Sequence, residues 1–181
     1  MSAPASWLVQ HADLLPRVGR ALDVACGRGR HAIWLAERGL ETVAVDRDAG
    51  AIDALGDLAR DRRLPIRAEI RDLEQEADPF RGETYDLIVV VHYLHRPLFP
   101  ALREALAPGG LLVYETFTRA QAARGRPTNP EFLLNAGELL ALVRPLEVLA
   151  SREGEYDDRM VASVIARRGA AAGLPPPVRL R

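Results

Sequence analysis

The chain has 181 residues, of which 48% are hydrophobic and 27% charged, and its formal net charge is −1 at pH 7. This size and composition predict a single globular domain over residues 1–168, and the near-zero charge provides no electrostatic field for holding nucleic acid. No apolar run reaches membrane-spanning length, and the single cysteine, Cys26, excludes an internal disulfide and favours a cytoplasmic location.

The expected elements alternate between strands and helices along the chain. Runs of apolar β-forming residues, or apolar–polar alternation, predict strands at residues 21–25, 42–45, 66–70, 85–91, 111–115, 146–151 and 160–166. An amphipathic pattern predicts a short helix at residues 5–15. Capping residues, and a proline in one first turn, predict helices at residues 29–38, 48–62, 97–106 and 135–143. This order predicts an α/β fold built on a doubly wound sheet.

Three other stretches have their own character. Residues 1–19 contain the first helix and a lead-in to the first strand, and the proline-rich residues 169–181 are predicted to be a flexible tail. Residues 118–135 contain two prolines and a glycine and are predicted to form a long irregular loop, of the kind that often closes over a site. The polar connector between the last two strands is too short for a parallel crossover, so this pair is predicted to be antiparallel.

The first strand leads directly into a glycine turn. Residues 27–32 read Gly-Arg-Gly-Arg-His-Ala, and this G-x-G-x-x-A pattern alone is typical of dinucleotide binding. Asp23 argues against a nicotinamide or flavin cofactor, because a dinucleotide-binding strand is normally apolar there and an unpaired buried carboxylate is costly. If the turn begins at Ala25, Asp23 ends the strand and can attend a cationic ligand such as S-adenosylmethionine.

Two further acids follow the next two strands. Asp46 ends the second strand, where its carboxylate can accept two hydrogen bonds from a ribose diol. Asp72 follows the third strand, where it can accept a hydrogen bond from an adenine amino group. Because open α/β sheets bind ligands at the carboxyl ends of their strands, the two acids predict an adenosine-containing cofactor.

With these motifs the chain resembles the class I S-adenosylmethionine-dependent methyltransferases, and among them the small tellurite-resistance-like enzymes. The resemblance covers residues 22–167. It rests on the Asp23-Val-Ala-Cys-Gly-Arg-Gly29 turn, Asp46, Asp72, the strand at residues 85–88 and Pro108-Gly109-Gly110. It implies a Rossmann-like doubly wound seven-stranded sheet, mostly parallel with the last strand antiparallel. Ala25 departs from the family pattern, in which a glycine often stands at that position.

The resemblance also implies how the cofactor is held. The Gly27 and Gly29 backbone would cradle its methionine part, while Asp23 would attend its cationic end. Arg30 and His31 open the following helix, where either could meet the cofactor carboxylate; for His31 a solvated first turn is an equal alternative. The implied cofactor-binding set is Asp23, Ala25, Gly27, Gly29, Arg30, Asp46, Arg47, Asp72 and Leu73.

Candidate residues for the chemistry follow the fourth and fifth strands. His92 is a candidate base and Arg96 a candidate ligand for an anionic acceptor. The candidate acceptor-binding residues are Tyr93, Glu115 and Arg126. Glu115 ends an apolar strand, so we expect an arginine partner from the following loop, which offers Arg119, Arg124 and Arg126.

The expected function is in-line methyl transfer from S-adenosylmethionine to a small molecule, leaving S-adenosylhomocysteine. The acceptor would be a thiol, a chalcogen oxyanion such as tellurite or selenite, or another metabolite, because the charge is near neutral and no N-P-P-Y tetrad follows the fourth strand. The alternatives are an RNA or protein methyltransferase, a catalytically silent cofactor-binding module and a nicotinamide oxidoreductase. We expect a monomer or homodimer, with no metal and no membrane partner.

Overall fold

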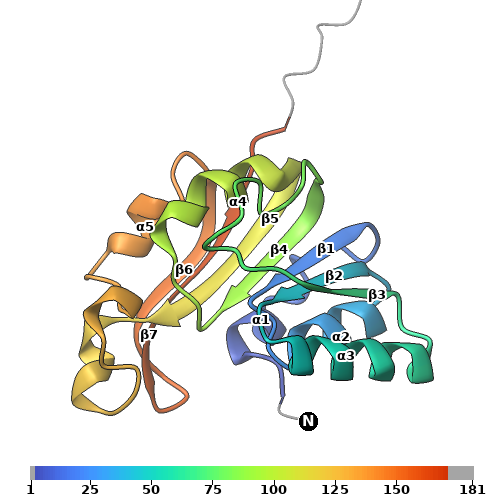
Figure 1. The fold of residues 1–181 in the computed structure, drawn as a ribbon. Coiled ribbons are helices and arrows are strands. Elements are labelled where there is room, and N and C mark those ends of the chain that lie inside the picture. Colours follow the sequence, from blue (N-terminus) through green and yellow to red (C-terminus); the bar gives the residue numbers. More distant parts are fainter. Residues whose placement is uncertain (1–2, 171–181) are drawn as a thin grey trace, which may run out of the picture.

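A seven-stranded sheet forms the centre of the computed structural model, which describes residues 3–170 (Figure 1). The strand order is β3-β2-β1-β4-β5-β7-β6. β7 runs antiparallel to both of its neighbours, and the other neighbouring pairs are parallel. The doubly wound sheet with its antiparallel closing strand is therefore confirmed. Most of the tail expected at residues 169–181 lies outside the described residues.

Every expected strand and helix is present, with some changes of length. The strands are β1 (Arg20–Val24), β2 (Glu41–Asp46), β3 (Ile66–Ile70), β4 (Tyr85–Val91), β5 (Leu106–Phe117), β6 (Glu147–Tyr156) and β7 (Arg159–Arg167). The α-helices are α1 (Ser6–Gln10), α2 (Arg30–Glu37), α3 (Ala49–Arg62), α4 (Phe99–Ala105) and α5 (Glu138–Leu142). Three short 3₁₀ helices complete the set: η1 (Arg96–Leu98), η2 (Arg119–Ala123) and η3 (Pro130–Phe132).

The differences in length have local causes. Asp48 caps α3 as expected, its side chain accepting a hydrogen bond from the Ala51 N–H at 3.1 Å. α5 starts later than expected because Gly137, in a left-handed conformation, is its N-cap. The expected pair still forms, since Glu138 accepts from the Asn135 backbone N–H at 2.7 Å.

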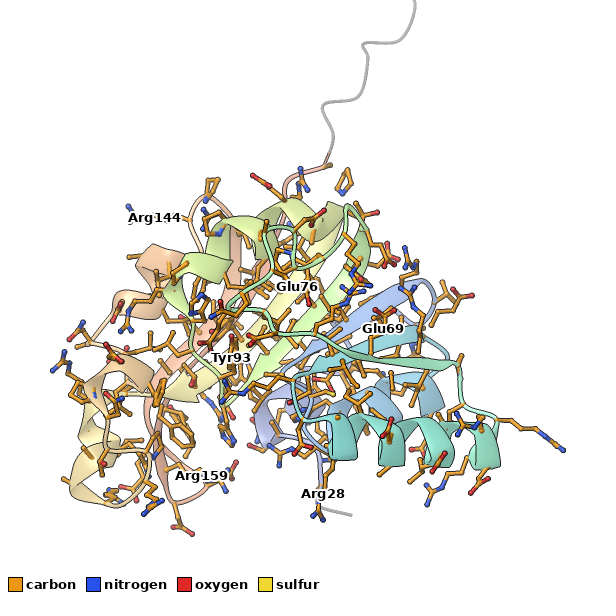
Figure 2. All side chains as sticks on the ribbon, viewed as in Figure 1. Arg28, Glu69, Glu76, Tyr93, Arg144 and Arg159 are labelled. Atoms are coloured by element: carbon orange, nitrogen blue, oxygen red, sulfur yellow. The ribbon has the colours of Figure 1, made fainter. Side chains whose placement is uncertain are left out.

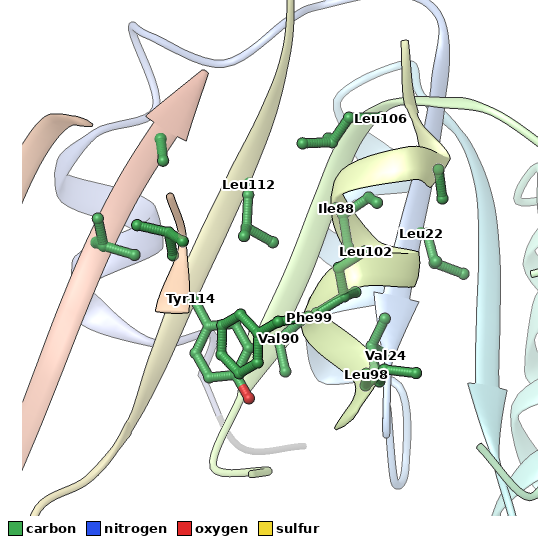
Figure 3. Packing of buried hydrophobic residues seen from close by; sticks show 14 of the residues in the cluster. Leu22, Val24, Ile88, Val90, Leu98, Phe99, Leu102, Leu106, Leu112 and Tyr114 are labelled. Carbon is green, nitrogen blue, oxygen red and sulfur yellow. The ribbon is translucent and has the colours of Figure 1, made fainter. Parts of the chain in front are cut away.

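Side chains of the central strands alternate between two apolar layers. Leu22 and Val24 of β1 and Tyr114 of β5 face the layer covered by α4 and α5, where the rings of Phe99 and Tyr114 stack with their centroids 4.9 Å apart (Figure 3). Ala21 of β1 faces the opposite layer, which is packed against α1 and α2. The alternation fixes the register, because a shift of one residue would exchange the two layers.

The strand order reverses between the neighbouring strands β1 and β4 (Figure 1). From β1 the chain continues to β2 and β3 on one side of the sheet, and from β4 it continues to β5 on the other side. The carboxyl ends of β1, β2, β4 and β5 meet at one edge there, and open α/β sheets bind ligands at this point. Across residues 3–170, no helix is both long enough and apolar enough to cross a membrane.

Candidate active site

In the turn between β1 and α2, every second residue from 25 to 29 has a left-handed backbone conformation: Ala25 at φ 52°, Gly27 at φ 52° and Gly29 at φ 73°. A Cβ on Gly29 would lie 2.5 Å from side-chain carbons of Leu55, so this glycine allows α3 to pack against the turn. A Cβ on Gly27 would meet no atom within 4 Å. Gly27 therefore faces open space, where a ligand can approach the backbone.

Asp46, at the end of β2, braces this turn. Its Oδ2 accepts a hydrogen bond from the Gly27 N–H at 2.7 Å, and its Oδ1 accepts one from the Asp48 N–H at 2.9 Å. The carboxylate is half-buried. Each oxygen keeps a further lone pair, so the side chain can accept two more hydrogen bonds from a diol.

Asp23 is buried beneath the same turn. Its Oδ2 accepts a hydrogen bond from the Ala32 N–H at 2.9 Å, but its Oδ1 has no hydrogen-bond partner among the described residues and lies 3.8 Å from Nδ1 of His31. Burial raises the pKa of this carboxyl to about 7, although the Ala32 N–H and the Arg30 charge act in the opposite direction. A cation next to Asp23 would favour its charged form.

A cleft of about 390 Å³ opens at this edge of the sheet. Its lining residues are Ala25, Asp46, Arg47, Arg71, Asp72, Leu73, Glu74, His92, Tyr93, Leu94, Phe117, Pro127 and Phe132. Figure 2 places Tyr93 between the two halves of the sheet, with Arg28 of the glycine turn and Arg159 of the β6–β7 hairpin below it. In the sheet, β2 and β3 lie on one side of β1, and β4 and β5 lie on the other side. The cleft therefore has a β2–β3 side and a β4–β5 side.

The β2–β3 side carries charged groups at the strand ends. Asp72 accepts a hydrogen bond from the Glu74 N–H at 3.1 Å and lies beside the buried Leu73. The sequence analysis missed Arg71, which is only 1% exposed. Its Nε and Nη2 donate to Glu69 at 2.9 and 2.6 Å, and its Nη1 donates to the Pro79 carbonyl at 2.9 Å. Arg71 thus fixes the loop that carries Asp72.

The β4–β5 side is apolar and aromatic. The ring of His92 stacks on that of Phe117, with centroids 4.6 Å apart and an interplanar angle of 20°. Burial, together with the charges of Arg159 and Arg30, lowers the pKa of His92 to about 4, so the imidazole is neutral at pH 7. Next to it, the Tyr93 carbonyl accepts a hydrogen bond from the Tyr114 hydroxyl at 2.8 Å. His92 and Tyr93 are therefore both held in place.

Four cleft residues on this side were missed from the sequence: Leu94, Phe117, Pro127 and Phe132. Phe117 lies two residues after the end of the expected fifth strand, a position that could have revealed it. Pro127 and Phe132 come from the 118–135 loop, whose path the sequence pattern does not specify.

Arg96 does not line the cleft. Its guanidinium donates to the Glu138 carboxylate through Nε at 2.6 Å and Nη2 at 3.0 Å. It also donates to the backbone carbonyls of Glu131 at 2.8 Å and Leu133 at 3.0 Å. The expected contact with an anionic acceptor is therefore replaced by an anchor for the loop, because Glu138 already occupies the guanidinium.

Glu115 is buried, and its partner differs from the one expected. Its Oε2 accepts hydrogen bonds from the Ser163 hydroxyl at 2.6 Å and from Arg152 of β6 at 3.1 Å. The loop arginines proposed as partners lie elsewhere. Arg124 pairs with Glu155 at 2.5 Å, and the Arg126 side chain is exposed. Arg152 prevails because β6 lies next to β7 in the sheet, a neighbour that sequence order does not reveal.

The start of α2 is covered by the N-terminal segment. Arg30 Nη1 donates to the Ala3 carbonyl at 3.1 Å. His31 is buried, and its Nε2 accepts from the Ala5 N–H at 3.3 Å. Burial lowers the pKa of His31 to about 3. The solvated first turn considered for His31 is therefore wrong, and its imidazole holds the N-terminal segment in place.

These features fit a cofactor with a cationic end and an adenosine group. The open space at Gly27 leaves room for it, and the unpartnered oxygen of Asp23 lies beneath the turn. Asp46 and Asp72 both line the cleft. Within residues 3–170, no group of three or more His, Cys, Asp or Glu side chains could hold a metal ion.

Comparisons with known proteins agree with this geometry. Residues 21–110 match the family described as a methyltransferase domain. The chain is 32% identical over 105 residues to a ubiquinone biosynthesis O-methyltransferase of Cereibacter sphaeroides, a match that covers 55% of this chain and 42% of that protein. This chain spans less than half the length of the curated relatives it matches.

Two solved structures extend the likeness over nearly the whole fold. TehB from Haemophilus influenzae superposes with a TM-score of 0.78 at 22% identity, covering 93% of this chain and 63% of TehB. An S-adenosylmethionine-dependent methyltransferase from Mesorhizobium loti gives a TM-score of 0.71 at 20% identity, covering 91% and 98%. These two likenesses show the fold. The match of residues 21–110 to the methyltransferase domain, on that fold, identifies the chain as a member of the class I S-adenosylmethionine-dependent methyltransferases, with S-adenosylmethionine as its cofactor.

Proposed function

We propose that this chain transfers the methyl group of S-adenosylmethionine to a small molecule bound over the ends of β4 and β5. The observation that carries the proposal is the division of one cleft into a charged side and an apolar, aromatic side. Its volume of about 390 Å³ lies within the usual range for small-ligand sites. The net charge of −1 gives no support to a nucleic-acid substrate.

On the charged side, each acid has a role that its geometry allows. Asp46 accepts hydrogen bonds from the ribose hydroxyls while it braces Gly27, and Asp72 accepts from the adenine amine. Asp23 stabilises the cationic end of the cofactor. Ala25, Arg47 and Leu73 line the cofactor side of the cleft, and Gly29 and Arg30 support the turn from outside it.

On the apolar side, the bound cofactor supplies an activated methyl group, and this chain's residues hold the acceptor in line with it. His92 and Tyr93 form the floor next to the methyl position. The 118–135 loop closes the acceptor side, and Arg96 keeps it in place through Glu138. Glu115 has a structural role and does not bind the acceptor, because its carboxylate accepts hydrogen bonds from Ser163 and Arg152. Arg126 acts only through the loop.

The experiment that tests this function is transfer of a labelled methyl group. Purified protein is incubated with methyl-labelled S-adenosylmethionine and a bacterial extract, which is then separated into volatile, small soluble, RNA and protein fractions. We expect label in the volatile or small soluble fraction. Label mainly in RNA or protein would contradict the proposal, and cofactor binding without any transfer would indicate a silent binding module.

Asp46→Ala provides the negative control for this assay. The change removes the ribose acceptor and leaves the Gly27 and Asp48 N–H groups without their partner. Two hydrogen bonds to a charged group amount to about 3 kcal/mol or more, so we expect roughly 100-fold weaker cofactor binding by calorimetry. Asp53→Ala, on the exposed face of α3, is the matched control and should bind the cofactor normally.

We also propose that residues 1–168 act as a single domain, with residues 118–135 as its acceptor-side loop. Arg96 of η1 binds this loop at the Glu131 and Leu133 carbonyls, and Arg124 of the loop pairs with Glu155 of β6, contacts that support one cooperative unit. The free, buried thiol of Cys26 is consistent with a reducing cytoplasm.

A further inference from the structure

Arg159, the first residue of β7, has no place in the roles described above. Arg159 does not itself line the cleft, but its Nη1 lies 3.4 Å from Nε2 of His92, which does. Two other arginines in this half of the chain have carboxylate partners, since Arg124 pairs with Glu155 and Arg167 with Glu147. Among residues 3–170, no carboxylate oxygen lies within 4.0 Å of the Arg159 guanidinium.

A second arginine reinforces the positive charge at this point. The pKa of Arg30 is lowered, first by burial and then by the charge of Arg159, while Asp23 and Glu115 act more weakly in the opposite direction. The hydrogen bond that Arg30 makes is to a neutral carbonyl, that of Ala3. Two guanidinium groups that repel each other beside a neutral imidazole favour an anion between them.

The wall beside these cations is made of flat, apolar groups. The stacked rings of His92 and Phe117 lie at the ends of β4 and β5, and Pro127 lines the same cleft. Phe132 also lines it, and this large apolar residue is 50% exposed. Burying its exposed ring against a ligand would be favourable, and aromatic rings prefer offset stacked or edge-to-face neighbours.

His92 also restricts the nucleophile. With a pKa of about 4, its imidazole is a weak base and does not drive the ionisation of a hydroxyl near neutral pH. A thiol, whose unperturbed pKa is about 8.5 and lower when bonded to an aromatic ring, is partly ionised without help. An oxyanion alone would use the arginines but would leave the apolar wall uncovered.

We propose, on the basis of the function proposed above, that the acceptor is an aromatic thiol carrying a carboxylate. Its ring lies against Phe117, Pro127 and Phe132, and its carboxylate is bound by Arg159 with support from Arg30. A thiolate lone pair forms the new carbon–sulfur bond as the methyl–sulfonium bond breaks. The electron pair of the broken bond stays on the departing thioether, and the thiol proton has already gone to water.

The test compares acceptors that differ in one feature at a time. The mercaptobenzoate isomers carry the ring, the thiol and the carboxylate. Thiophenol lacks the carboxylate, 3-mercaptopropionate lacks the ring, and selenite lacks both the ring and the thiol. We expect kcat/KM for the best mercaptobenzoate to exceed that of each other probe by about 10-fold or more, since a charge-assisted hydrogen bond supplies a factor of this size.

The Arg159→Gln variant tests whether Arg159 binds the carboxylate of the acceptor. We expect it to lower kcat/KM for mercaptobenzoate by about 10-fold or more, mainly through KM, and to leave thiophenol turnover within about 2-fold. Arg159→Lys should restore part of the loss. Arg167→Gln, at the other end of β7, is the matched control and should leave kcat/KM for both substrates unchanged. Equal effects of Arg159→Gln on both substrates would overturn the proposal.

A binding measurement separates this inference from the proposed function. Methylthiobenzoate, which cannot accept a methyl group on a thiol, is titrated calorimetrically into the complex with S-adenosylhomocysteine. Binding that Arg159→Gln weakens about 10-fold supports the inference even if no transfer is observed, in which case the proposed function fails alone. Absence of binding at millimolar concentration, or a preference for selenite in the transfer assay, overturns the inference while methyl transfer stands.

Discussion

The two sides of the cleft are held together by different kinds of contact. On the cofactor side, the turn is fixed by bonds between close sequence neighbours and adjacent strands, such as Asp46 to the Gly27 N–H, 19 residues away. On the acceptor side, charged side chains join distant segments. Arg96 reaches Glu138 across 42 residues, and Glu115 reaches Ser163 across 48.

This difference affects how each side can change. Hydrogen bonds to the backbone of the turn form only when the turn keeps its left-handed conformation, and few residue types other than glycine adopt that conformation. A short sequence motif therefore determines the cofactor side. Ion pairs between distant segments depend on a few long side chains that other sequences can replace. We therefore expect substitutions at the turn to act on stability and cofactor binding together, and substitutions at the ion pairs to act on the acceptor loop.

The largest effect on stability is expected from Gly29→Ala. The new Cβ would meet Leu55 at 2.5 Å, in a left-handed backbone conformation. Overpacking and the left-handed conformation together predict a loss of about 3 kcal/mol, measured by urea unfolding. Gly27→Ala has the same backbone cost but no clash, so we expect a loss of only about 1 kcal/mol. Equal losses for the two variants would show that the packing of α3 is not decisive.

An intermediate effect is expected from Arg96→Gln on the acceptor side. The change removes the pair with Glu138 and two hydrogen bonds to the carbonyls of Glu131 and Leu133. We expect about 2 kcal/mol of destabilisation and faster amide exchange between residues 130 and 138, with the glycine turn unaffected. Arg62→Gln, which breaks an exposed pair with Glu37, should change stability very little.

The same pair makes stability depend on pH. The hydrogen bond from Arg96 lowers the pKa of Glu138 to about 2, from an ordinary value of 4.5. Because the pKa is lower in the folded state, this stabilisation is complete above about pH 4.5 and is lost as the pH falls towards 2. Glu138→Gln should flatten the unfolding free energy over this range. An unchanged pH profile would contradict the role of the pair.

The fold could be predicted because its signals are local. Strand β4 is a continuous apolar run, and Asp48 marks the start of α3 where the chain changes from strand to helix. The doubly wound order then follows from the alternation of elements. The start of α5 could not be predicted in this way, since its N-cap is Gly137 in a left-handed conformation, which the pattern does not require.

The site divides in the same way. Asp46 and Asp72 could be placed at the cleft because each ends or follows a parallel strand. Arg96 and Glu115 could not be placed, because the partners of both lie on elements far along the chain. A charged residue near a strand end can face either a ligand or a distant side chain, and the sequence alone does not distinguish the two.

The smallest effect is expected from Ala25→Gly, which tests how strictly the turn motif depends on conformation. Ala25 adopts φ 52°, a region that costs an L-residue about 1 kcal/mol but costs glycine little. Glycine also gains freedom in the unfolded chain, which offsets most of this benefit. We therefore expect a change in unfolding free energy below about 1 kcal/mol, towards higher stability, with cofactor affinity unchanged. Ala54→Gly, on the exposed side of α3, should instead lose about 1 kcal/mol, because glycine is unfavourable within a helix. A loss of similar size in both variants would mean that the methyl group of Ala25 contributes to packing at the cleft, and that the backbone conformation alone does not select the residue there.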